Sequence, residues 1–141
     1  AVATHGRSAT RGALEAALSR RAVVARVVAA GIADDPGATA SERERAGELV
    51  AAADHAERAD AGVREAAENA LSAALARTDA RGRPAALVAE LADAETRVMM
   101  ARRFYNDAVR DTRSLGERRL VRLLHLGGTA PLPQFFEIIE R

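Results

Sequence analysis

The chain has 141 residues, of which 48 % are hydrophobic and only 3 % aromatic, and its formal net charge is +1. This length suits one domain with a single core, and the absence of cysteine excludes both a disulfide framework and a thiolate metal site. Because the net charge is close to zero, no global field steers the protein toward nucleic acid or anionic lipid.

Residues 1–10 are small and polar, which predicts a disordered arm or an expression remnant. A first helix is expected from about Arg11 to Ala33. Its apolar residues recur at steps of three, four and seven, which places them on one helical face: Leu14, Leu18, Ala25, Val28 and Ile32. Arg21 interrupts this apolar stripe.

A second helix is expected from Ser41 to about Asp79, after a turn marked by Pro36 and Gly37. The sequence Ser41-Glu-Arg-Glu44 has the form of a capping box, in which the hydroxyl and the carboxylate each accept from a backbone amide at the helix start. The expected seam is rich in alanine, so another helix axis can approach it closely. It comprises Leu49, Ala53, Ala56, Val63, Ala67, Ala70, Leu71, Ala74 and Leu75.

A third helix is expected from Ala85 to Arg113 or beyond, and Pro84 suits its first turn. This helix has the most regular apolar face of the chain, at Leu91, Ala94, Val98, Ala101, Tyr105, Ala108 and Thr112. Gly116 is expected to end or kink it. Residues 117–126 are amphipathic, and we favour their packing in the bundle over an anionic membrane surface for Arg118, Arg119 and Arg122. Gly127 and Gly128 interrupt the pattern before a short apolar tail.

No alternating strand pattern of useful length is present, so the expected fold is all-α: an antiparallel bundle of three long helices plus a short C-terminal helix, forming one domain over residues 11–141. Residues 34–80 are acidic, with eleven Asp and Glu against five Arg, and both flanks are basic. Helices of opposite charge that pack edge to edge explain this distribution, and solvated faces of mixed sign explain it equally well.

Several short motifs resemble those of the LemA family, in the same order along the chain. Ala17-Leu-Ser-Arg-Arg21 is similar to its Leu-x-Arg-Arg motif, Ala67-Glu-Asn-Ala-Leu71 to its Ala-Glu-Asn-x-Leu motif, and Pro133-Gln-Phe-Phe-Glu137 to its terminal Phe-Phe-Glu. The third-helix pattern of the family is matched at Glu95, Arg97, Ala101, Arg102, Tyr105, Asn106, Val109 and Arg110. The connection at 81–84 is shorter than the insert usual in the family, and the usual tryptophan and second Tyr-Asn pair are absent.

The resemblance implies a helical domain of a membrane-anchored protein, facing the cytoplasm, with a single transmembrane anchor upstream of Ala1. A long rigid bundle offers extended faces for partners, and no motif in the sequence assembles a reaction centre. We therefore expect a protein-interaction or scaffold role toward an unknown partner, with no cofactor and no catalysis. The alternative is a soluble helical adaptor or a nucleic-acid-associated regulator, although nucleic-acid binding is disfavoured by the balanced charge. A carboxylate-rich metalloenzyme is a third hypothesis.

The candidate residues for an interhelical polar network or an interaction surface are Arg20, Arg21, Glu68, Asn69, Glu95, Arg97, Arg102, Tyr105, Asn106 and Arg110. Because guanidinium forks match carboxylates, Arg20, Arg21 and Arg102 are expected to meet Glu68 and Glu95, and a role in fixing helix register is favoured over recognition. Tyr105 is expected to bury its ring and keep its hydroxyl bonded. His5, His55 and His125 share no metal-ligand spacing, so no metal site is expected.

Overall fold

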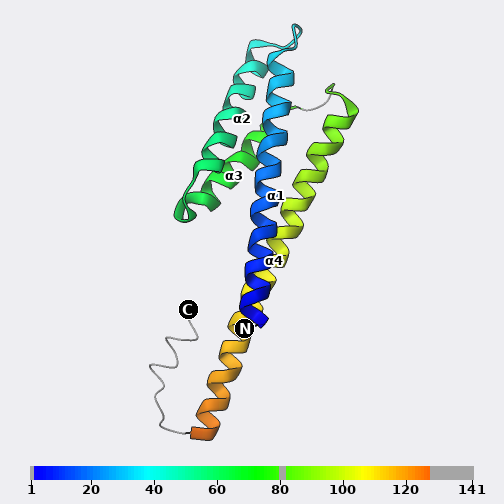
Figure 1. Ribbon diagram of the computed structural model, residues 1–141. Coiled ribbons are helices and arrows are strands. Elements are labelled where there is room, and N and C mark those ends of the chain that lie inside the picture. Colours follow the sequence, from blue (N-terminus) through cyan, green and yellow to red (C-terminus); the bar gives the residue numbers. More distant parts are fainter. Residues whose placement is uncertain (1, 80–81, 128–141) are drawn as a thin grey trace. The chain divides into compact units, whose positions relative to one another are not determined.

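The computed structural model describes residues 2–79 and 82–127 (Figure 1). Its elements are α1 (Val2–Ala33), α2 (Ala40–Arg58), α3 (Ala61–Arg77) and α4 (Ala85–Gly127). The described residues contain no strand, which confirms the all-α class. The chain divides into two compact units: a central unit, Glu15–Met100, and a terminal unit that contains Ala1–Leu14 and Ala101–Arg141.

Helix α1 begins at Val2, so residues 2–10, expected as an arm, are helical. Gly6, the one glycine among residues 2–10, costs only about 1 kcal/mol in a helix interior, which does not stop a helix of otherwise favourable residues. Within the central unit α1 buries the expected residues Leu18, Ala25, Val28 and Ile32. Arg21, which interrupts the stripe in the sequence, is buried with them.

The expected single helix from Ser41 to Asp79 is wrong, because the chain breaks at Ala59 and Asp60. Both residues have extended backbone angles, and α2 and α3 pack against one another on either side of them (Figure 1). The break rotates α3 out of register with α2. As a result Val63 and Ala70, expected in the seam, face solvent, and Val63 is 53 % exposed.

The core of the central unit is built mainly of alanine, with a few larger residues from three helices. Its members are Ala22, Ala25, Val28, Ala29, Ile32, Ala46, Leu49, Ala53, Ala56, Ala67, Leu71, Ala74 and Leu75. Leu87 and Leu91 at the start of α4 pack against it. Dividing residues 41–79 into two helices lets both halves contribute to one core, which buries apolar area that a single long helix would leave in water.

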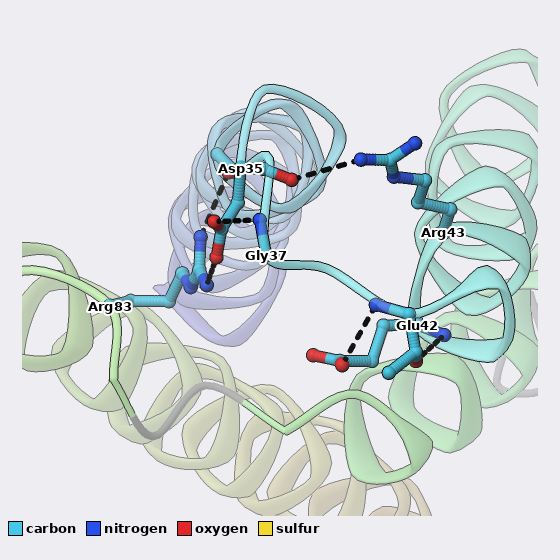
Figure 2. Close-up of polar contacts among 7 residues, drawn as sticks. Asp35, Gly37, Glu42, Arg43 and Arg83 are labelled. Atoms are coloured by element: carbon cyan, nitrogen blue, oxygen red, sulfur yellow. Dashed lines mark hydrogen bonds and ion pairs between the residues drawn. The ribbon is translucent and has the colours of Figure 1, made fainter.

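The capping box of α2 is formed two residues before the expected one. The Thr39 hydroxyl accepts from the Glu42 amide at 3.1 Å, and the Glu42 carboxylate accepts from the Thr39 amide at 3.1 Å (Figure 2). Both Thr39-x-x-Glu42 and Ser41-x-x-Glu44 have the required pattern. After the turn at Pro36 and Gly37 the chain is already helical at Ala40, so Thr39 is the N-cap residue. The capping box is therefore Thr39-x-x-Glu42.

Helix α4 continues through Gly116 to Gly127, so residues 117–126 extend it and do not form a separate short helix. Gly116 is buried and lies in the interior of α4, so the helix does not end there as one of the two expectations had it. On the expected apolar face, Ala94, Val98 and Ala101 are buried. The apolar tail, Phe135, Phe136, Ile138 and Ile139, lies outside the described residues, as does the Phe-Phe-Glu motif.

Candidate functional site: interhelical arginine contacts and an adjoining hollow

A buried charged pair joins α1 to α3. Arg21 is 4 % exposed and Glu68 is 3 % exposed, and Arg21 Nη2 lies 3.9 Å from Glu68 Oε1. The Arg21 guanidinium also donates to the Ser72 hydroxyl at 2.8 Å and to the Glu68 carbonyl at 3.1 Å. Because charges buried in a core require partners, these contacts fix the register of α1 against α3.

Arg26 connects α1 to α2 through two carboxylates. Its Nε donates to Asp54 at 2.9 Å and its Nη1 donates to Glu57 at 2.8 Å, while Nη2 lies 2.8 Å from an oxygen of each. The hydrogen bonds that Arg26 donates, first to Glu57 and then to Asp54, raise the pKa of its guanidinium, and the hydrogen bond from Arg26 lowers the pKa of Glu57. Apolar periodicity and short motifs do not identify these three residues, although the acidic segment at 34–80 between basic flanks indicates ion pairs of this kind.

A third arginine contact ties the start of α4 to the end of α1. Arg83 donates to the Asp35 carboxylate at 2.6 Å and to the Gly31 carbonyl at 2.8 Å, and Figure 2 shows both contacts. The Asp35 carboxylate also accepts from the Gly37 amide, and the Asp35 carbonyl accepts from Arg43. The hydrogen bond from Arg83 is the main cause that lowers the pKa of Asp35. A cation at the C-terminal end of a helix also complements its dipole.

Beside the Arg21–Glu68 pair lies a hollow of about 310 Å³ within the central unit. Its wall combines apolar, hydroxyl and charged groups from three helices: Leu18, Ser19, Ala56, Glu57, Arg64 and Glu68. The Nε atom of Arg64 is buried and has no hydrogen-bond partner among the described residues. This nitrogen is closed off from solvent, so Arg64 does not present it to the hollow.

Four residues of the expected polar network lie in the central unit, and among these the structure brings together Arg21 and Glu68. Arg20 and Glu95 are exposed and form none of the ion pairs found among the described residues, and Asn69 is exposed as well. Arg97 is exposed and pairs at 2.8 Å with Asp93 on its own helix. Adjacent positions on a helix point about 100° apart, so Arg20 and Arg21 cannot both face the core.

The remaining candidates lie in the terminal unit. Arg102 and Tyr105 are half-buried, and Asn106 and Arg110 are exposed. Arg110 lies 3.8 Å from Asp107 on the same helix. Tyr105 is thus less buried than expected for a core tyrosine.

Within the described residues, no helix is long and apolar enough to cross a membrane. The described part of the chain also contains no group of three His, Cys, Asp or Glu residues placed to hold a metal ion. No known family model, no curated protein and no solved structure matches the chain.

Proposed function

We propose that the chain is a LemA-like helical domain that acts by protein interaction, without catalysis, in a membrane-anchored protein with this domain on the cytoplasmic side. The Leu-x-Arg-Arg and Ala-Glu-Asn-x-Leu motifs support the proposed family. Arg21 from the first and Glu68 from the second share one buried contact. Two motifs far apart in the sequence would therefore serve one purpose, which is to fix the register of α1 and α3.

The observation that carries the interaction role is an exposed apolar pair on α1. Val23 and Val27 are one helical turn apart, and they are 52 % and 49 % exposed. The opposite face of α1 is anchored by Arg21 and by the alanine-rich core, so these valines are presented by a rigid helix. Exposed apolar side chains on a rigid face are typical of protein docking surfaces.

A photo-crosslinking amino acid placed at position 27 tests the interaction role in cells that express the full-length protein. We expect a discrete adduct from position 27 that is lost when Val23→Asp is added, because a charge beside the contact disfavours docking. The matched control is the same amino acid at exposed Glu44 on α2. Equal adducts at positions 27 and 44 would contradict a docking surface on α1.

Fractionation of the full-length protein, followed by protease treatment from each side of the membrane, tests the anchored part of the proposal. Recovery with membranes and protection of this domain on the cytoplasmic side is the expected result. Recovery in the soluble fraction would refute anchoring and would favour the alternative of a soluble adaptor.

The basic end of α4 favours the alternative of nucleic-acid association. Arg113, Arg118, Arg119 and Arg122 are all exposed there. Fluorescence anisotropy with a labelled DNA duplex at increasing salt would test this alternative, because phosphate contacts make affinity fall steeply with salt. Binding that is absent at low salt would eliminate it.

A further inference from the structure

The outward face of α1 carries a regular row of exposed residues within the central unit, which we call the α1 stripe. Its members recur at alternating steps of three and four residues: Ala16, Arg20, Val23, Val27, Ala30 and Asp34. Asp34 follows the last residue of α1, and its amide still donates to the Ala30 carbonyl at 3.0 Å, so the helical path extends to it. Alternating steps of three and four are the spacing of helices that pair along a common seam.

The centre of the α1 stripe is apolar. Val23 and Val27 are each about half exposed, at 52 % and 49 %. Ala16 and Ala30 have small side chains, so the axis of a second helix can approach toward the low end of the usual range of about 8–10 Å. Removing the two valines from water would favour such pairing.

The α1 stripe carries opposite charges on the two sides of its valines, Arg20 before them and Asp34 after them. Neither residue belongs to the ion pairs found among the described residues. Acidic residues are absent from the positions three and four residues away from Arg20, and basic residues from those around Asp34, so neither has a partner one helical turn away. The complementary surface therefore has an apolar centre and the reverse order of charges.

The α1 stripe itself has this reverse order when a second copy runs in the opposite direction. With Val23 of one copy beside Val27 of the other, Arg20 of each copy lies about one turn, or about 6 Å along the axis, from Asp34 of the other. A parallel pair in register would instead place Arg20 beside Arg20 and Asp34 beside Asp34, and these like charges would repel. The order of charges thus selects the antiparallel pair, in which two-fold symmetry makes both contacts equal.

We propose that the α1 stripe binds the same stripe of a second copy of this chain, with the two helices antiparallel. This inference rests on the docking role of Val23 and Val27 proposed above and names the partner at that surface. Because the stripe is one face of one helix, whereas permanent interfaces bury about 2,000 Å² or more, the dimer is reversible and depends on concentration.

Sedimentation velocity of the 141-residue chain over a concentration series tests the proposal. We expect a monomer at low concentration and a dimer at high concentration, in one reversible equilibrium. Val23→Asp should weaken dimerisation by about tenfold or more, because it puts a charge into the apolar centre. A chain that stays monomeric throughout the series would overturn the proposal.

Charge reversal tests which face pairs and in which direction. Arg20→Asp and Asp34→Arg should each weaken dimerisation by about tenfold or more, because each puts like charges together at both ends of the pair. The double variant Arg20→Asp/Asp34→Arg restores opposite charges and should dimerise within about threefold of the parent chain. Arg45→Asp, a reversal at an exposed position of α2, is the matched control and should dimerise as the parent does.

Circular dichroism shows that each charge-reversal variant is folded. Folded single variants that dimerise as the parent does, or a folded double variant that stays as weak as the single ones, would overturn the antiparallel assignment.

The photo-crosslink at position 27 in cells separates this inference from the docking role on which it rests. An adduct with twice the mass of the full-length protein supports both. An adduct with a different protein, together with a purified chain that stays monomeric, would overturn self-association and leave the docking role standing. Equal adducts from positions 27 and 44 would contradict the docking role itself.

Discussion

Arg21 and Glu68 lie 47 residues apart in the sequence, and both are almost completely buried where α1 meets α3. Arg20, the neighbour of Arg21, is exposed. This pair of adjacent arginines offers a direct measure of what the buried contact contributes.

Replacing Arg21 with Ala should destabilise the protein by about 3–5 kcal/mol, because it leaves a carboxylate buried without its guanidinium. Arg20→Ala, the control, should change the free energy of unfolding by about 0.5 kcal/mol or less. Urea unfolding followed by circular dichroism measures both. The double variant Arg21→Met/Glu68→Leu should recover much of the loss, since it removes both buried charges. A small effect of Arg21→Ala alone would mean that the pair does not hold the helices together.

The position of the α2 cap is tested by two substitutions. Thr39→Ala should destabilise by about 1 kcal/mol, because it removes the acceptor of the Glu42 amide. Ser41→Ala should have an effect of about 0.5 kcal/mol or less. Chemical denaturation measures the difference, and the reverse order of the two effects would place the cap where the sequence pattern first suggested.

Two glycines should respond to alanine with opposite signs. Gly82 has φ 88°, a backbone conformation that a side chain disfavours, so Gly82→Ala should destabilise by about 1–2 kcal/mol. Gly47 lies within α2 with open space around it, so Gly47→Ala should stabilise by about 0.5–1 kcal/mol. Thermal unfolding midpoints report both shifts. A stabilising Gly82→Ala would be incompatible with the turn before α4.

Stability should decrease in acid through Asp35 and Glu57. Hydrogen bonds from Arg83 and Arg26 lower the pKa values of these carboxyls below their usual range of about 4, so the folded state binds their protons more weakly than the unfolded chain does. The resulting stability is present above the unfolded pKa values and is lost as pH falls through the folded ones. Urea unfolding from pH 7 to pH 3 should show this loss. The variant Asp35→Asn/Glu57→Gln should have a shallower acid slope, and an unchanged slope would disprove these contributions.

Features that depend on neighbouring residues along the chain can be predicted from the amino-acid sequence. The apolar period of 3.6 residues identified helices and much of their buried faces, from Leu18 to Ile32 on α1 and from Ala94 to Ala101 on α4. Pro36 and Gly37 marked the turn before α2, because proline and glycine disfavour continuation of a helix.

The choice of which charges meet, and the position of the break in the long second segment, depend on how the helices pack in three dimensions. Periodicity does not specify how one helix is rotated against another, so it did not distinguish Arg20 from Arg21 or pair Arg26 with Asp54 and Glu57. Asp60, the N-cap residue of α3, and Gly62 are local signals of the break, but neither ends a helix by itself, and packing of α2 on α3 makes the break favourable. The hollow at Arg64 depends on the same break, because residues of α1, α2 and α3 line it. A linear pattern of residues does not specify how three helices lie beside one another.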